Sequence, residues 1–209
     1  MAPWWRRVTA GLTVAVLAGA VAWLFTPAGG AWREAALAVL GGGREPDAER
    51  IQAISQSLAA ATPEELERAE KNVRAVHERM NQIAGWGHLS LLRDRQSPAW
   101  DAVREVLEGD ALRFLRDVAP RLTPASVGRD LQAFAKALEE GYARRDADRV
   151  RVAHRIVHDL DYFVFNHETV PGGDRHYWGA TITLEGEDAL AQEVLGPAGE
   201  AGTPAGGRP

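Results

Sequence analysis

The stretch that decides the fold is Val150 to Asn166, which reads V-R-V-A-H-R-I-V-H-D-L-D-Y-F-V-F-N. It is the most apolar helix-like segment outside the N-terminus. Projected at about 100° per residue, its apolar side chains cover about half of the helix circumference. The residues on this arc are Val150, Val152, Ala153, Ile156, Val157, Leu160, Phe163 and Val164. The pattern predicts a helix with one buried face.

A polar stripe runs along one edge of that arc. It consists of His154, His158 and Asp161, which stand at positions i, i+4 and i+7 and therefore lie about one turn apart. Two imidazoles and a carboxylate with this spacing can bind a transition metal from a single helix. The alternative is structural, because histidines at a core boundary also hydrogen-bond a neighbouring helix or a returning loop. Arg155 and Tyr162 are expected to point further round, towards solvent.

His77 is a further candidate ligand, on a helix predicted from Pro63 to about Ile83. It lies just outside the apolar face of that helix, as His154 does on its own. Facing helices of a bundle commonly build one site between them. His77 could therefore complete a site for a divalent transition metal with His154, His158 and Asp161, although the sequence does not identify the metal. A plain surface or hydrogen-bonding role for His77 remains the alternative.

The rest of the domain is predicted to be helical as well. Thr62-Pro63-Glu64-Glu65 is a typical helix start, with Thr as N-cap and Pro at the first position. Apolar residues at three-to-four spacing predict further helices over about residues 47–60, 98–108, 112–120 and 124–142. Short links without alternating strand patterns indicate an all-α, up-and-down bundle of four or five helices, with a solenoid as a minor alternative. The turn around Trp86 is expected to close one end of the bundle with its indole.

The helix-like spacing of apolar residues ends at Asn166. We therefore assign residues 47–166 to the bundle and 167–195 to a C-terminal segment, here called the clasp. Turn residues in the clasp are followed by a β-like run from Tyr177 to Leu184, which predicts a short strand or an extended cover over the bundle. Two further histidines, His167 and His176, could reach the end of the histidine helix from there. The Gly- and Pro-rich tail, residues 196–209, is predicted to be disordered.

The N-terminus indicates a membrane segment. Two arginines in residues 1–7 precede residues 8–25, a run of 18 residues without charge that nearly spans a hydrocarbon core. Because basic residues stay in the cytoplasm, the remainder is expected outside it. We favour an uncleaved single-pass anchor in the cell membrane. A signal peptide cleaved after the small residues 20–22, with secretion, is the alternative. Residues 26–46 would then form a juxtamembrane segment with a glycine hinge at 41–43.

Composition and charge exclude several classes of function. Of 209 residues, 45% are hydrophobic and 25% charged, which is ordinary globular usage and fits one folded domain. A net charge of -5 without a basic run argues against nucleic acid as a partner. The absence of cysteine excludes disulfides, thiolate zinc sites and cysteine nucleophiles. No phosphate-binding loop, nucleophile elbow or H-E-x-x-H motif is present, so the sequence leans against an enzyme.

Two functions from different classes are compatible with these features. The first is a membrane-anchored, extracytoplasmic bundle that acts as an interaction or scaffold module and binds another envelope protein. The second is a metal-binding or metal-sensing bundle that uses the polar stripe and His77. An exposed apolar patch on the bundle would favour the first function, and convergence of three or more ligands within a few Å would favour the second.

Overall fold

The computed structural model describes residues 47–167 and 176–196. Both ranges belong to a compact unit, Glu45–Pro209. All regular elements within these two ranges are helices and no strand occurs in them, which confirms the all-α prediction. The predicted anchor, hinge and tail fall on residues 1–46 and 197–209, which lie outside the described residues. None of the helices in the described part of the chain is long and apolar enough to cross a membrane.

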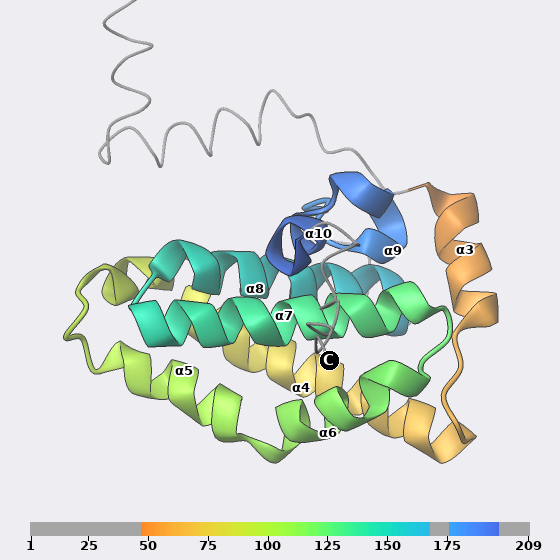
Figure 1. Cartoon of the computed structure of the whole chain (residues 1–209), viewed down its shortest axis with the longest axis horizontal. Helices are drawn as coiled ribbons and strands as arrows, with labels where there is room; N and C mark the ends of the chain where they lie inside the picture. The colour runs from red at the N-terminus through yellow and green to blue at the C-terminus, as the bar shows by residue number, and fades with distance from the viewer. Residues whose placement is uncertain (1–46, 168–175, 197–209) are drawn as a thin grey trace, which may run out of the picture. The chain divides into compact units, whose positions relative to one another are not determined.

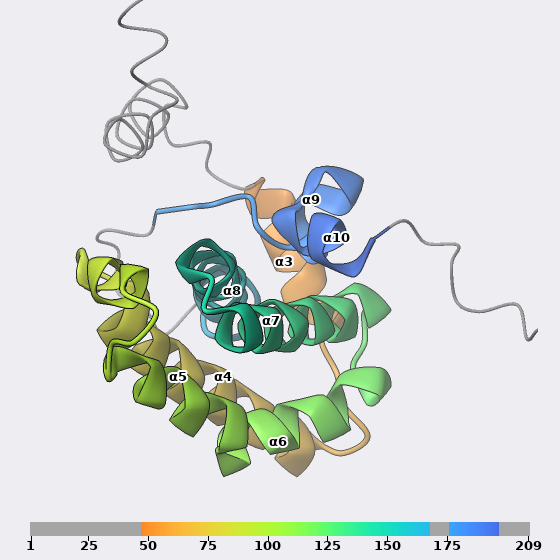
Figure 2. The ribbon, with the colours of Figure 1, turned by 60° about the vertical axis from the view of Figure 1, so that its left-hand side comes forward.

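The elements are arranged in three tiers (Figures 1 and 2). The helices are α3 (Ala48–Ser57), α4 (Pro63–Ala84), α5 (Ala99–Glu108), α6 (Asp110–Val118), α7 (Ala125–Arg144), α8 (Ala147–Asp159), α9 (Ile182–Glu185) and α10 (Leu190–Leu195). Four tighter or wider turns complete the order: 3-10 turns η1 (His88–Arg93), η2 (Ala119–Arg121) and η4 (Gly186–Asp188), and a π-helical turn η3 (Leu160–Phe165) that continues α8. Figure 2 shows α7 and α8 between a lower tier of α4, α5 and α6 and an upper group of α3, α9 and α10.

The start of α4 follows the sequence signal. Thr62 Oγ1 accepts a hydrogen bond from Glu65 N at 3.1 Å, and Glu65 Oε2 accepts one from Ala61 N at 3.1 Å. These bonds satisfy backbone donors that a helix start leaves without an intrahelical partner. The cap thereby fixes the residue at which α4 begins. His77 then lies on the buried side of this helix.

The turn between α7 and α8 sets the closest helix pair of the fold. Arg145 ends α7 in a left-handed conformation (φ 53°), and Asp146 Oδ1 then caps α8 by accepting from Asp148 N at 2.9 Å. A Cβ atom at Gly141 would lie 2.9 Å from Val150 Cγ2, which is too near for a side chain. Glycine at this position therefore lets the two helices approach each other.

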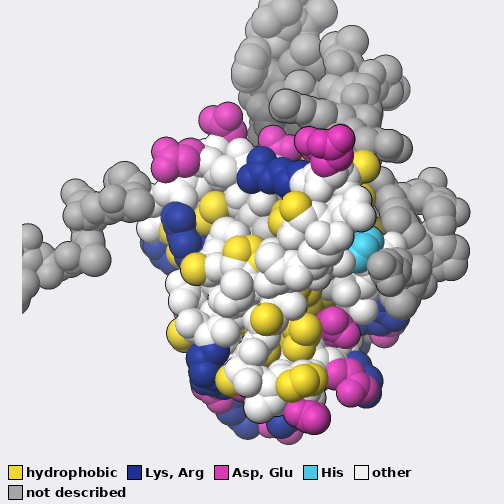
Figure 3. All heavy atoms as spheres, turned by 90° about the vertical axis from the view of Figure 1, so that its right-hand side faces the viewer, with side chains coloured by type: hydrophobic (Ala, Val, Ile, Leu, Met, Phe, Trp, Pro, Cys, Tyr) yellow, Lys and Arg dark blue, Asp and Glu magenta, His cyan; other side chains and the backbone are white. Residues whose placement is uncertain are grey.

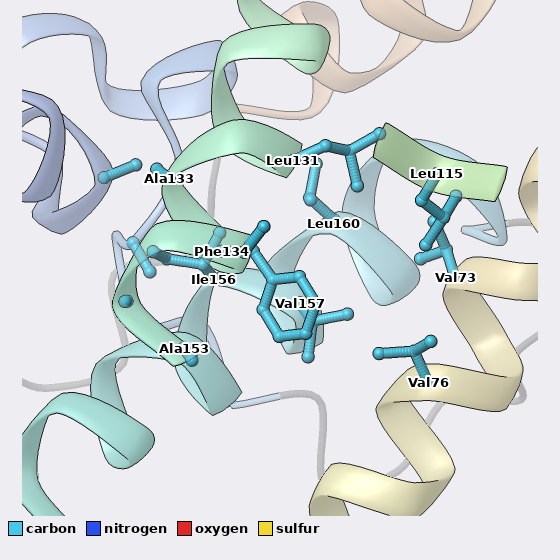
Figure 4. Packing of buried hydrophobic residues seen from close by; sticks show 14 of the residues in the cluster. Val73, Val76, Leu115, Leu131, Ala133, Phe134, Ala153, Ile156, Val157 and Leu160 are labelled. Atoms are coloured by element: carbon cyan, nitrogen blue, oxygen red, sulfur yellow. The ribbon is translucent and has the colours of Figure 1, made fainter. Parts of the chain in front are cut away.

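The predicted buried face of the Val150 to Asn166 stretch is present. Val150, Ala153, Ile156, Val157 and Leu160 are all fully buried. In Figure 4, side chains of α8 and η3 share one interior with Leu131 and Phe134 of α7 and Val73 and Val76 of α4. The core therefore lies where the middle tier meets α4, and the candidate site borders it.

Exposed ion pairs contribute little beside this core. Lys71 and Glu67 form one at 2.6 Å, and Arg151 and Asp148 another at 2.7 Å. Figure 3 shows basic and acidic side chains of the described residues interspersed over one face. Pairs of this kind are worth about 0 to 1 kcal/mol each, whereas burying one large apolar side chain is worth about 1.5 to 3 kcal/mol. Apolar burial therefore dominates the stability of the bundle.

The clasp contains no strand in its described part, so the short strand predicted within Tyr177 to Leu184 is wrong, whereas the alternative of an extended cover fits its first residues. Its first residues are extended and then turn into α9. The reason lies in the backbone donors, which bind buried carboxylates instead of a neighbouring strand. Asp159 accepts from Trp178 N and Ala180 N at 3.2 and 2.8 Å. Asp130 of α7 accepts from Ile182 N and Thr183 N at 2.6 and 3.0 Å.

The prediction that Trp86 closes the end of the bundle is also wrong. Its side chain is 81% exposed. Trp86 and Gly87 both have positive φ angles, 45° and 86°, so the backbone turns sharply after α4 and the indole lies outside the core. Buried Leu92, in the η1 turn that follows, packs into the core near this region.

Replacing Leu160 with Ala tests the assignment of the core. Leu160 is fully buried, so Leu160→Ala should lower the free energy of unfolding by about 2 to 5 kcal/mol through lost burial and the cavity left behind. Gln132→Ala on the exposed side of α7 should cost less than about 0.5 kcal/mol. Urea denaturation of both variants measures the difference, and equal losses would contradict the helical packing.

Candidate functional site

Three imidazoles from two helices meet in the interior. His77 comes from α4, and His154 and His158 come from α8. Their ring centroids are 5.1 Å apart for His77 and His158, 5.8 Å for His77 and His154, and 6.3 Å for His154 and His158. All three side chains are buried, with exposed fractions of 1, 9 and 7% for His77, His154 and His158. The structure thus brings His77 to both histidines of the stripe.

Asp161 contacts His77 from the start of η3. Asn166 N donates to Asp161 O across five residues at 2.9 Å, which closes this π-helical turn. Asp161 Oδ2 accepts from His77 Nδ1 at 2.7 Å, and Oδ1 accepts from Asn166 Nδ2 at 2.6 Å. Arg74 Nε is 3.8 Å from the same carboxylate. Asp161 therefore binds the Nδ1 side of the His77 ring, opposite Nε2.

The other two histidines also have one ring nitrogen engaged. His154 Nε2 donates to Asn81 Oδ1 of α4 at 2.7 Å, and His158 Nδ1 lies 3.2 Å from Asp159 Oδ1. Because a carboxylate or an amide oxygen accepts, the engaged nitrogen of each ring carries the proton. In a neutral ring the second nitrogen then holds a lone pair, and these nitrogens are Nε2 of His77, Nδ1 of His154 and Nε2 of His158. His77 Nε2 is buried and has no hydrogen-bond partner.

Burial keeps the two histidines of α8 neutral. It lowers the pKa of His154 to about 3, with a smaller contribution from charge on His77. It lowers the pKa of His158 to about 3 for the same reasons. Neutral imidazole is the form that binds a metal, since protonation removes the lone pair. Both rings are therefore in the ligand form at neutral pH.

Asp159 connects the histidine cluster to the clasp. Its carboxylate is fully buried and accepts from Trp178 N and Ala180 N besides its contact with His158. Burial raises the pKa of Asp159 to about 7, against the opposing effect of the two backbone hydrogen bonds. The segment that covers the site is thus held by the same carboxylate that contacts one of its histidines.

Aromatic rings surround the cluster. The Tyr162 ring lies 4.9 Å from that of His77 and 4.5 Å from that of His158. The Trp178 ring lies 6.3 Å from His158, and the Arg155 guanidinium is 4.3 Å from the centroid of Trp178. The expectation that Arg155 and Tyr162 point to solvent holds only in part, because both are half-buried. Arg155 lies against Trp178 of the clasp, and Tyr162 lies one turn after His158 and contacts it.

The geometry of the cluster is close to that of a metal site without reaching it. Among the described residues, no three His, Cys, Asp or Glu side chains are already arranged to hold a metal ion. With Zn–N distances of about 2.0 Å, two imidazoles on a tetrahedral zinc have ring centroids roughly 5 to 5.5 Å apart. The separation of His77 and His158 is in this range, and the two distances to His154 exceed it by about 1 Å or less.

The structure adds residues to the site that the sequence reasoning missed. Asn81 lies one turn after His77 on α4, and this i, i+4 spacing was the available signal. Trp178 gave no signal in spacing, because its meeting with His158 depends on the path of the clasp. Of the two further histidines, His176 packs against Trp178 with ring centroids 4.1 Å apart. Comparison with protein families, curated proteins and solved structures finds no match, so function has to be argued from the site.

The lowered pKa of His154 predicts how stability depends on pH in the metal-free protein. Below pH 6.5 the unfolded chain protonates this histidine while the folded protein does not, until pH about 3. The unfolded state therefore binds more protons, and the free energy of unfolding falls as the pH falls through this window. His154→Gln should make that decline shallower by about 1.4 kcal/mol per pH unit.

Urea denaturation with EDTA between pH 6 and pH 4 measures this slope. His88→Gln is the matched control, because His88 is exposed on the turn after α4. An unchanged slope in His154→Gln would contradict a buried neutral His154.

Proposed function

We propose that this chain is a metal-binding helical bundle in which His77, His154 and His158 hold a divalent transition metal. One observation carries the proposal: three buried imidazoles each use one nitrogen on a carboxylate or amide, and the free nitrogen of His77 is buried without a partner. A buried polar atom left without a partner costs about 1 to 3 kcal/mol. A metal bond to His77 Nε2 removes this cost.

The side chains that hydrogen-bond the three rings support the same function. Histidines that bind metals usually direct the other nitrogen at a carboxylate, a carbonyl or water, which fixes the ring and strengthens the ligand. Asp161 has this relation to His77, Asp159 to His158, and the Asn81 oxygen to His154. The ligand set therefore differs from the one expected from sequence, since Asp161 acts through His77.

The donor set favours zinc. Three neutral imidazoles suit zinc, copper, nickel or ferrous iron. No thiolate is available, because the chain has no cysteine. Zinc bound by three histidines is tetrahedral with one position left for another ligand. The 5.1 Å separation of the His77 and His158 rings is compatible with that geometry.

Added zinc should stabilise the folded protein. At about 100 times the dissociation constant, a ligand that binds only the folded state adds about 2.7 kcal/mol, which for a domain of this size raises Tm by about 5 to 10 °C. Thermal unfolding of the purified full chain in mild detergent, with and without zinc at pH 7.5, measures the shift. Manganese, which prefers oxygen ligands, should produce a smaller one.

Variants of the three histidines locate the site. His154→Gln and His158→Gln should each lose most of the zinc-induced shift, because each removes one ligand while keeping a polar side chain. His88→Gln, an exposed histidine outside the cluster, should keep it. If zinc leaves the Tm of the parent protein unchanged, the cluster is only structural. The same follows if zinc raises the Tm of the double variant His154→Gln, His158→Gln as much as that of the parent.

We also propose that residues 8–25 anchor the bundle in the cell membrane and that the bundle lies outside the cytoplasm. The support is the uncharged run of 18 residues after two arginines. A second candidate function, an interaction module that binds an envelope protein, is favoured by the exposure of Trp86 and Leu91, at 81 and 58%. The two lie five residues apart around the turn after α4, and it is contiguous exposed apolar patches that mark contact surfaces.

Protease accessibility tests this topology. Protease added to cells whose outer barrier has been removed should digest the bundle while a cytoplasmic marker protein survives. If the bundle resists until the membrane is opened, the orientation is reversed. Release of the bundle into the medium without residues 8–25 would instead identify a cleaved signal peptide.

A further inference from the structure

The turn after α4 presents two large apolar side chains to solvent. Trp86 is 81% exposed and Leu91, in η1, is 58% exposed. Trp86 also has a φ of 45°, a left-handed conformation in which a bulky side chain is strained. The turn thus holds an indole in water and in an unfavourable backbone conformation, and such strain is often found where a residue serves a function.

Four arginines without an ion pair lie at the same end of the bundle. Arg93 ends η1 and Arg95 follows it, while Arg144 ends α7 and Arg145 leads into α8. Arg95 Nη2 donates to Arg144 O at 2.9 Å, so the two turns are neighbours, as Figure 1 also shows. Within the described residues no carboxylate pairs with any of the four, whereas most other arginines there have a carboxylate partner within 4 Å.

Trp100 of α5 holds these two turns together from the inside. Its Nε1 donates to Asp94 O at 3.1 Å, and the Arg145 guanidinium lies 5.2 Å from its ring centroid. The acidic residues next to the four arginines in the chain are Asp94 and Asp146, and both accept backbone hydrogen bonds. Four positive charges thus stand beside two negative ones, on a chain with a net charge of -5.

We propose that this end of the bundle docks on the surface of a lipid bilayer that contains anionic lipid. We call it the basic tip, and it consists of Trp86, Leu91, Arg93, Arg95, Arg144 and Arg145. Tryptophan favours the headgroup level of a membrane, where its ring leaves water while its N–H stays hydrated. Arginines at this level are attracted to anionic lipid. The proposal rests on the proposed anchor and adds which end of the bundle meets the membrane.

The small size of the apolar surface favours a bilayer over a protein partner. A stable protein interface buries about 800 Å² on each side, whereas one Trp and one Leu provide roughly half of that. A bundle that is already tethered to the membrane needs less, because its docking is intramolecular. Residues 26–46 span at most about 70 Å, and the 22 residues of α4 only about 33 Å, so a tether of this length lets either end of the bundle reach the bilayer.

A single cysteine can report on this contact, because the chain has none of its own. Ser90→Cys introduces one at an exposed position between Trp86 and Leu91 in the chain. The full chain, labelled there with an environment-sensitive fluorophore, is reconstituted into vesicles of phosphatidylcholine with or without phosphatidylglycerol. In the anionic vesicles the emission should shift to the blue, and spin-labelled lipid should quench it. The same label at Gln132→Cys, on the exposed side of α7, should stay in water.

Two pairs of substitutions test the charges of the tip. Arg93→Gln with Arg95→Gln should lower the ratio of docked to undocked protein in anionic vesicles about 25-fold, at about fivefold for each charge near the surface. Arg104→Gln with Arg113→Gln is the matched control, because these exposed arginines of α5 and α6 pair with carboxylates. Quenching of the Ser90 label that is equal in the two double variants would overturn the proposal.

Flotation of the vesicles in a density gradient separates the remaining outcomes. A chain that does not float with the vesicles contradicts the anchor and the docked tip together. If the chain floats but the Ser90 label stays in water, the anchor stands and the tip does not dock on lipid, which leaves this surface to a protein partner. Trp86→Ser with Leu91→Ser should remove the blue shift, and a label that remains quenched in this variant would also count against the tip.

Discussion

The buried carboxylate of Asp159 is the interaction on which the site and its cover depend. A fully buried acid must be neutralised or surrounded by donors, because transfer of an unpartnered charge from water to the interior is prohibitively costly. Here the donors are two backbone N–H groups of the clasp and one nitrogen of His158. The carboxylate therefore attaches the C-terminal segment to α8 and orients a histidine of the cluster with the same group.

Asp130 repeats this arrangement on α7. It accepts from Ile182 N, Thr183 N and Thr183 Oγ1, the last at 2.6 Å, and burial raises its pKa to about 6. Two carboxylates, on neighbouring helices, thus take the donors that a strand partner would otherwise take. This accounts for a segment with strand-like composition that crosses the bundle without forming a sheet, and it explains why Trp178 lies over the histidines.

Sequence patterns within single helices predicted those parts of the structure that depend on residues close together in the chain. The cap at Thr62, the apolar arc of α8 and the approach of His77 to that helix all follow from spacing within one helix or between two adjacent faces. The missed features depend on contacts that are distant in sequence. The path of the clasp is one of them, because Asp130 and Asp159 bind its backbone donors from helices far away in the sequence. The prediction for Trp86 was wrong because composition does not show which side of a sharp turn faces the core.

The energetic cost of burying the cluster bears on the proposal that it binds a ligand. Three apolar side chains could fill the same space between α4 and α8 without burying ionisable rings, and such replacements of buried polar groups are often neutral or stabilising. The cluster instead holds two histidines whose pKa values fall to about 3 and one ring nitrogen with no partner. Buried polar groups that oppose stability in this way are expected at functional sites, where a bound partner offsets the strain. At this cluster the buried atom without a hydrogen-bond partner is Nε2 of His77, so this nitrogen is the point at which the proposed metal would act.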